Sequence, residues 1–267
     1  MNKAQEKPTV IKLGGAALAQ PSTLLSLLEQ VQAALGQRPW VLVHGGGALV
    51  DEWLCNMGCS TEKRHGQRVT PAEQMPVVTG ALAGYSNKAL VSVAQTAGID
   101  ALGLSLLDAA CVPLLPVHEL GQVGTPDWQK IADQQAMYAQ RLQVLLAGKL
   151  TPVVSSIGGL ADGQLVNVNA DLAAAAIAFV LEAELVLLSD VAAVLDAEGQ
   201  PIGDITYSQG HALLAQDFVQ GGMYIKLQAA LEAASRCRRT TAITSWENPQ
   251  QVVALLQGQS IGTRILS

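Results

Sequence analysis

The chain has 267 residues, of which 49% are hydrophobic, 14% are charged and only 4% are aromatic. A chain of this length can bury one substantial core, and this composition suits a parallel sheet covered by helices on both faces. The formal net charge of −6 argues against a protein that coats nucleic acid or an anionic membrane. The longest apolar run, residues 172–181, is too short to span a bilayer, and we expect a cytoplasmic protein.

Two strand–glycine–helix units begin the chain. In the first, an apolar run at 10–13 is followed by Gly14 and Gly15, and leucines at helical spacing follow over 21–35. The second repeats the order at 41–57, with Gly45-Gly46-Gly47 after the apolar run. Glycines at such turns let backbone N–H groups approach a phosphate closely. The pattern predicts a phosphate-handling α/β enzyme.

The remaining elements follow in chain order. Residues 60–70 are charged and predict a surface hairpin or flap. Further elements are expected as follows: a helix over 71–97 broken near two glycines, strands at 101–107 and 111–117, a hairpin or loop at 120–129, a helix over 134–147, a strand at 151–155, a turn region at 158–168, a helix starting at Asn169, a strand at 185–189, helices over 208–216 and 222–236, a strand at 241–244 and a last helix over 249–256.

Several motifs of other classes are incomplete. No glycine cluster is followed by the Gly-Lys-Ser/Thr of a P-loop. The run from Gly45 to Val50 fits a dinucleotide fingerprint only in part, because a valine stands where a small residue should allow close helix packing. A dinucleotide-dependent dehydrogenase therefore stays as an alternative. The four cysteines lack the spacing of a zinc site, and no metal-ligand set is predicted.

Six motifs, read in order, resemble those of the amino-acid kinase family. They are Ile11–Gly15, Val43–Gly47, Gly66–Thr70, Asn167–Asp171, Ser189–Val191 and Gly221–Lys226. The resemblance continues to the closing residues 262–266. It implies a three-layer αβα sandwich around a mostly parallel sheet, the carbamate kinase-like fold. It also implies one domain with an N-terminal lobe (about 1–181) for an acyl amino acid and a C-terminal lobe (about 182–267) for ATP.

The implied reaction is ATP-dependent phosphorylation of the side-chain carboxylate of N-acetyl-L-glutamate, giving an acyl phosphate for arginine biosynthesis. Mg²⁺ would be carried by the nucleotide, with no metal ligand from the protein. A homodimer is implied as well. Because only a short polar segment precedes the first strand, the family pattern leads us to expect an enzyme that arginine does not inhibit.

Three residues are implied as catalytic. Lys12 and Lys226 would stabilise the transition state from opposite lobes, and Asp171 would hold both lysines in place. Phosphoryl transfer depends mainly on positioning and charge neutralisation, which suits two lysines. Each residue also has a purely structural explanation. Lys12 could be a solvated lysine at a strand end, and Lys226 a solvated lysine on a helix. Asp171 could be an acid that only favours the helix dipole.

The resemblance also implies the binding residues. Gly14 and Gly15 would offer N–H groups to the transferred phosphoryl group, and Gly46 and Gly47 would do the same beside the substrate carboxylate. Arg68 would bind the α-carboxylate through its planar fork, and Asn167 would lie beside the N-acetylamino acid. The alternative for Arg68 is a solvent-exposed surface residue that binds no ligand.

The nucleotide would lie against two segments. These comprise Asp190, Val191, Ala192, Ala193, Val194, Leu195, Phe218, Val219 and Gln220. Here the sequence departs from the family pattern, because Ala192-Ala193 replace the usual Ser-Gly. His44 is expected to be a packed strand-end residue, since a carboxylate nucleophile is already ionised near neutral pH.

Two further alternatives remain at this stage. Another acyl-phosphate-forming kinase of the family would act on acetylaminoadipate, glutamate, aspartate or carbamate. A binding protein without activity is expected to have lost Lys12, Asp171 or Lys226, and all three are present.

Overall fold

An eight-stranded sheet forms the centre of the computed structural model, which describes residues 7–64, 66–237 and 240–266. The strand order is β12 (Asp204–Thr206), β14 (Thr263–Leu266), β13 (Thr241–Ser245), β11 (Glu184–Ser189), β1 (Thr9–Leu13), β2 (Trp40–His44), β8 (Thr151–Ser155) and β5 (Ala101–Ser105). Neighbouring strands are parallel except for the antiparallel pair β13–β14. The expectation that arginine does not inhibit the enzyme rests on the segment before β1. Residues 1–6, most of that segment, lie outside the described residues.

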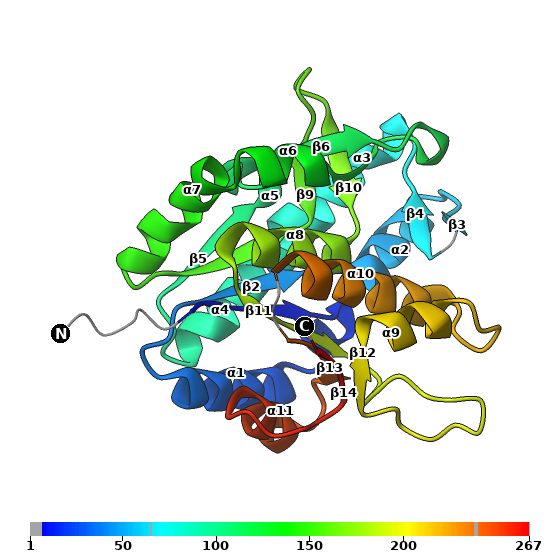
Figure 1. Cartoon of the computed structure of the whole chain (residues 1–267). Helices are drawn as coiled ribbons and strands as arrows, with labels where there is room; N and C mark the ends of the chain where they lie inside the picture. Colours follow the sequence, from blue (N-terminus) through cyan, green and yellow to red (C-terminus); the bar gives the residue numbers. More distant parts are fainter. Residues whose placement is uncertain (1–6, 65, 238–239, 267) are drawn as a thin grey trace.

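Helices cover both faces of this sheet (Figure 1). One face carries α7 (Gln135–Ala147), α8 (Ala170–Leu181) and α10 (Gly221–Cys237), and the other carries α1 (Pro21–Leu35), α4 (Asn87–Thr96) and α11 (Pro249–Leu256). Each face has its own apolar core cluster. The expected three-layer αβα sandwich with a mostly parallel sheet is confirmed.

The central strands are buried along their whole length, because helices cover both sides of a parallel sheet. Every residue of β1, β2, β8 and β13 is buried. Lys12 is therefore a charged residue in the interior of the middle strand β1, with 6% of its surface exposed. An ammonium group in such a place needs a partner of opposite charge.

Two small sheets lie beside the central one. The first has the order β6 (Leu114–Pro116), β7 (Val123–Pro126), β10 (Leu165–Val168) and β9 (Ile157–Gly159). The second pairs β3 (Glu62–Arg64) with β4 (Gln67–Val69) in antiparallel fashion, and we call it the β3–β4 ribbon. It confirms the hairpin expected at 60–70.

The remaining elements are shorter. They are η1 (Gly15–Ala19), α2 (Gly47–Asn56), η2 (Ala72–Gln74), α3 (Met75–Thr79), the π-helix η3 (Gly80–Ser86), α5 (Leu106–Ala109), η4 (His118–Leu120), α6 (Trp128–Asp133) and α9 (Tyr207–Leu214). Within the described ranges, none of the helices combines the length and the apolar character needed to cross a membrane.

Some predicted bounds are wrong. The strand expected at 101–107 ends at Ser105, because the Ser105 side chain caps α5 through a capping box with Asp108. The strand expected at 111–117 is shortened to β6. The turn region expected at 158–168 is wrong at both ends, because β9 and β10 pair with each other there. The elements β7, α6, β12 and β14 were not predicted as such.

Candidate functional site

A cavity of about 510 Å³ opens where β1 and β2 end. In open parallel sheets, ligands bind outside the carboxyl ends of the strands. The N-termini of α2, α8 and α10 all contribute to its lining, through Gly47, Ala170 and Gly221. Helix N-termini present free N–H groups and partial positive charge. Among the described lining residues, the cations Lys12, Lys63, Arg68 and Lys226 face one carboxylate, Asp171, so the cavity suits anions.

Lys12 and Asp171 form a buried ion pair in this cavity. The Nζ of Lys12 lies 2.8 Å from Oδ1 of Asp171, and each side chain is 8% exposed. Asp171 thus supplies the opposite charge that the buried ammonium needs.

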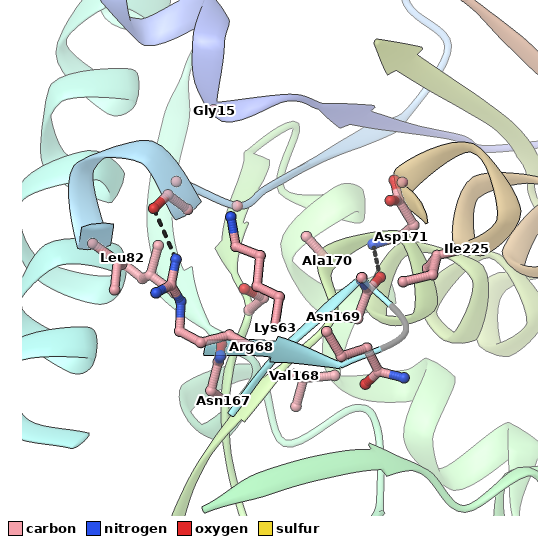
Figure 2. A pocket seen from close by; sticks show the side chains of 18 of the residues that line it. Gly15, Lys63, Arg68, Leu82, Asn167, Val168, Asn169, Ala170, Asp171 and Ile225 are labelled. Atoms are coloured by element: carbon pink, nitrogen blue, oxygen red, sulfur yellow. Dashed lines mark hydrogen bonds between the residues drawn. The ribbon is translucent and has the colours of Figure 1, made fainter. Parts of the chain in front are cut away.

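Asp171 is placed by the first turn of α8. The Asn169 side chain caps this helix by accepting hydrogen bonds from the backbone N–H groups of Asp171 (2.9 Å) and Leu172 (3.1 Å). Figure 2 shows the first of these bonds. Asparagine is a favoured residue at this position. The helix predicted to start at Asn169 is confirmed, with Asn169 as its cap, and Asn169 itself lines the cavity.

Lys226 reaches the same cavity from α10, on the other side of the site from β1. Its Nζ lies over the start of its own helix, 3.5 Å from where a Cβ on Gly222 would stand. No ion pair joins Lys226 to Asp171 among the described residues. Asp171 is therefore paired with Lys12 in this structure, and its role in holding both lysines stays a prediction.

Asp190 follows strand β11, and the charges of both lysines affect its pKa. A hydrogen bond from Ser189 Oγ (2.8 Å) and the charges of Lys226 and Lys12 lower the pKa of Asp190, although partial burial opposes this shift. Asp190 is therefore a carboxylate within the electrostatic influence of the two cavity lysines.

The loops after β1 and β2 touch each other at two glycines. A Cβ on Gly15 would lie 2.8 Å from Gly46 Cα, and a Cβ on Gly46 would lie 2.8 Å from Leu82 Cδ2 and 2.9 Å from Ser86 Oγ. Real Cβ atoms do not approach backbone so closely, so Gly15 requires glycine, whereas a side chain at Gly46 would have to displace the side chains of Leu82 and Ser86. The π-helix η3 supplies Leu82 and Ser86, and π-helical turns often occur at functional sites.

Arg68 is held against the start of α2 by both ends of its fork. Its Nη1 donates to Asp51 Oδ1 (2.6 Å) and its Nη2 donates to the carbonyl oxygen of Gly47 (3.0 Å) (Figure 2 shows the second contact). Asp51 also accepts from Lys63 Nζ at 3.1 Å. Partial burial opposes ionisation of Asp51, but the hydrogen bonds from Arg68 and Lys63 outweigh it and lower its pKa.

The β3–β4 ribbon is anchored at its base and touches α10 near its turn. Asn167 Nδ2 donates to Thr70 Oγ1 (3.3 Å), and the Thr70 N–H donates to the carbonyl of Leu120 (2.8 Å). A Cβ on Gly66, which has φ +76°, would lie 2.7 Å from Ile225 Cδ1 of α10. The ribbon thus connects the start of α2 with the helix that carries Lys226.

His44 ends β2 directly before the three glycines and is buried. Its Nδ1 lies 2.8 Å from the Gly45 carbonyl oxygen and its Nε2 lies 3.0 Å from Asn87 Nδ2. The Asn87 amide also donates to the carbonyl oxygens of Leu104 (3.2 Å) and Val153 (2.9 Å). Burial lowers the pKa of His44 to about 4, so the ring is neutral, with Nδ1–H donating to Gly45. This confirms the prediction of a packed strand-end residue.

The residues expected to hold the nucleotide lie outside the cavity lining, apart from Gly15. The Asp190–Leu195 loop is fixed by buried Thr263, whose Oγ1 accepts from the Val194 N–H (2.9 Å) and donates to the Ile202 carbonyl (2.5 Å). In the Ala192-Ala193 pair, the first residue is exposed and the second is buried. Phe218 and Gln220 are exposed and Val219 is buried.

The structure gathers most of the remaining predicted residues in one place. The cavity lining includes Lys12, Gly15, Gly46, Gly47, Arg68, Asn167, Asp171 and Lys226, but not Gly14. The contributions of Asp51, Lys63, Thr70 and Ser156 were not predicted. Asp51 stands one helical turn after Gly47, and that spacing next to a glycine loop was the available signal.

Comparison with known proteins shows the family and the fold of this chain. A model of the amino acid kinase family matches residues 7–245. Acetylglutamate kinase of Colwellia psychrerythraea (strain 34H) is 46% identical over 99% of this chain and 99% of the relative, and acetylglutamate kinase of Serratia proteamaculans (strain 568) is 44% identical over 97% and 99%. The solved carbamate kinase of Giardia lamblia bound to AMP-PNP shares the fold, with a TM-score of 0.69 at 17% identity over 98% of this chain and 99% of that one.

This chain belongs to the amino acid kinase family. Its α/β fold with a mostly parallel central sheet is the carbamate kinase-like fold.

Proposed function

We propose that this chain catalyses ATP-dependent phosphorylation of the side-chain carboxylate of N-acetyl-L-glutamate, a step of arginine biosynthesis. The supporting observation is a cavity that gathers the ammonium groups of Lys12 and Lys226, glycine N–H groups and Arg68. In addition, relatives named acetylglutamate kinase are 42–46% identical over nearly the whole chain. The product is N-acetyl-L-glutamyl 5-phosphate.

The proposed reaction is a direct transfer between two anions. A carboxylate oxygen attacks the γ-phosphorus of ATP, the new O–P bond forms, and the bond to the β–γ bridging oxygen breaks with release of ADP. Lys12 and Lys226 stabilise charge on the moving phosphoryl group from opposite sides. Asp171 orients Lys12, as their 2.8 Å ion pair indicates.

The other residue roles are proposals of the same kind. Arg68 and Asn167 bind the N-acetylated amino acid, and the N–H groups of Gly46 and Gly47 meet its reacting carboxylate. Gly15 presents its N–H to the phosphates, together with Gly14. The nucleotide lies against 190–195 and 218–220, in the C-terminal lobe (182–267), and the acyl amino acid occupies the N-terminal lobe (1–181).

The cavity fits a nucleotide that brings its own cation. Gly15, Gly46, Lys12 and Lys226 line the same cavity, so backbone N–H groups and ammonium groups are available to the phosphates. Among the described residues, no cluster of three or more His, Cys, Asp or Glu side chains is arranged to bind a metal. We propose that Mg²⁺ enters on the ATP phosphates, where it neutralises charge on the leaving group.

We also propose a cytoplasmic homodimer. Exposed apolar side chains such as Leu102 on the edge strand β5 and Met137 and Val144 on α7 are the kind of surface that an assembly covers. Light scattering at micromolar concentration should give twice the mass of the chain, and a monomer would contradict the proposal.

A hydroxamate assay tests the substrate. The protein is incubated with ATP, Mg²⁺ and, in turn, N-acetyl-L-glutamate, N-acetyl-aminoadipate, glutamate, aspartate and carbamate, and acyl phosphate is trapped with hydroxylamine. Turnover should be confined to N-acetyl-L-glutamate. Strong turnover of free glutamate would overturn the assignment.

The role of Lys226 is tested by Lys226→Ala. We expect kcat to fall by about 100-fold or more with little change in either KM, because removing one donor to transition-state charge has an effect of this size. Lys130→Ala is the control, since Lys130 is exposed on α6. An unchanged kcat in Lys226→Ala would remove this residue from the catalytic site.

A further inference from the structure

Asp51 is a carboxylate at the substrate side of the cavity to which neither the motifs nor the proposed reaction assigns a role. It stands on α2, and each of its oxygens contacts a different strand of the β3–β4 ribbon. Oδ2 accepts from Lys63 Nζ of β3 at 3.1 Å, and Oδ1 accepts from Arg68 Nη1 of β4 at 2.6 Å. Asp51 therefore joins both strands to the helix that begins at the glycine loop.

The two cations that Asp51 contacts lie directly opposite each other. Lys63 and Arg68 are register partners in the ribbon, and Figure 2 shows their side chains leaving the ribbon next to each other. Like charges in this position destabilise an antiparallel pair, and a two-stranded ribbon alone is marginal in water. One carboxylate between the two cations offsets their repulsion and fixes the ribbon on α2.

The same contact sets the orientation of the Arg68 fork. Arg68 is 93% buried at its side chain, and its two engaged donors point at Asp51 and at the Gly47 carbonyl. A guanidinium has five N–H donors, so the others remain for a ligand. With Lys63, Arg68 and Asp51 ionised, this group carries one net positive charge, which matches one carboxylate of a substrate.

We propose that Asp51 is a positioning residue for substrate selection: it holds Lys63 and Arg68 so that the guanidinium meets the α-carboxylate of the N-acetylated amino acid. This inference rests on the proposed function. It predicts that Asp51 affects the affinity for substrates that carry an α-carboxylate, and that it has little effect on the chemical step.

The test compares two acids in the full-length protein. N-acetyl-L-glutamate carries the α-carboxylate, whereas 4-acetamidobutanoate keeps the acetamido group and the reacting carboxylate but lacks it. In Asp51→Asn we expect KM for N-acetyl-L-glutamate to rise by about tenfold with kcat within about twofold, while kcat/KM for 4-acetamidobutanoate changes little. The preference for N-acetyl-L-glutamate should thus shrink by about tenfold.

Two further variants separate orientation from charge and from general damage. Glu52→Gln removes one negative charge from the neighbouring, exposed position and should leave both acids unaffected. Lys63→Gln keeps the Arg68–Asp51 pair and should lower the preference less than Asp51→Asn does. An equal loss in Lys63→Gln and Asp51→Asn would overturn the proposal, and so would an unchanged preference or a lower KM in Asp51→Asn.

Hydrogen exchange gives a readout that needs no turnover. Amides of 62–64 and 66–70 should exchange faster in Asp51→Asn than in the unaltered protein or Glu52→Gln, while amides of β1 and α8 stay protected. Unaltered exchange in the ribbon would contradict the proposal that Asp51 holds the ribbon on α2. If the unaltered protein turns over neither acid, the proposed function fails, and the exchange comparison still decides whether Asp51 holds the ribbon.

Discussion

Lys12 is a charged side chain on a strand that is otherwise apolar and buried, and its only described carboxylate partner within ion-pair distance is Asp171. A buried pair of this kind contributes little to stability relative to apolar residues, but removal of one partner leaves an uncompensated charge in the interior. The pair is therefore better explained by what it does in the cavity than by what it adds to the fold.

Two variants test whether the Lys12–Asp171 pair stabilises the fold. Asp171→Ala should lower the free energy of unfolding by about 3 kcal/mol, because the Lys12 ammonium then lacks its partner. The double variant Lys12→Met/Asp171→Leu should recover most of this loss and remain inactive. Urea unfolding followed by circular dichroism measures both, and a double variant less stable than the single one would contradict the explanation.

His44 gives a prediction for pH. Its pKa is about 4 in the folded protein against a usual 6.5, so the unfolded chain binds a proton between these values and the folded protein does not. Stability therefore falls as the pH drops from about 6.5 towards 4, by up to about 3 kcal/mol from this residue. Urea midpoints at pH 7.5 and 5 should differ more in the unaltered protein than in His44→Gln. Equal differences would show that His44 does not titrate in this way.

Helix α8 acts as a unit because its N-terminus is capped and its body is almost entirely buried alanine, leucine, isoleucine and valine. The Asn169 side chain satisfies two backbone donors and thereby fixes where Asp171 lies. Another asparagine, Asn248, caps α11 by accepting from the Gln251 N–H (3.2 Å) on the opposite face. The two caps are matched in chemistry and differ in their distance from the cavity.

We therefore expect Asn169→Ala and Asn248→Ala each to lower stability by about 1 kcal/mol, which is typical for the loss of such a cap. Only Asn169→Ala should also reduce kcat, because only this cap orients a residue of the cavity. Thermal melts and steady-state kinetics on both variants check this. Equal kcat values would mean that Asp171 keeps its place without the cap.

Long periodic segments could be predicted from sequence at the level of the element. The helix over 21–35 and the strand over 151–155 agree with α1 and β8 because apolar spacing and flanking turn residues indicate the same structure. The short strands β12 and β14 could not be predicted, since three or four mixed residues become a strand only when a neighbour supplies their hydrogen bonds. The π-helix η3 has no sequence signal of this kind.

At the scale of the whole molecule, some residues of the candidate site could be predicted from the sequence and others could not. Residues inside glycine-rich motifs, such as Lys12, Gly46 and Lys226, could be assigned from the order of those motifs. Asp51 and Lys63 could not be, because their contact depends on how the β3–β4 ribbon folds back onto α2. The single pairing of Asp171 likewise depends on the direction of the Lys226 side chain, which no motif specifies.

The ribbon also links distant parts of the chain, because Gly66 packs against Ile225 and Gly221 of α10. Gly66→Ala would place a methyl group in that contact, at a residue whose φ is +76°. Gly163 has a similar φ of +87° with open space around it, so Gly163→Ala causes the same backbone strain without the contact. The backbone strain alone should cost about 1 kcal/mol of stability at each position, and Gly66→Ala should cost more because of the added contact.

The two variants should differ in function. Gly66→Ala should raise the KM for the acyl amino acid and for ATP together, because it pushes the ribbon away from the helix that carries Lys226. Gly163→Ala should leave both KM values as they are. Steady-state kinetics decides, and an effect confined to the acyl amino acid would show that this contact does not couple the two substrates.

The Asn87 amide has a consequence for how this protein can change over generations. It joins the end of β2 to the carbonyl groups of β5 and β8 while it fixes the tautomer of the histidine before the glycine loop. Buried contacts of Asn87 and His44 thus help to set the orientation of the glycine loop that follows β2. In a selection for arginine prototrophy, Asn87 and His44 should tolerate as few replacements as the lysines do, although neither lines the cavity.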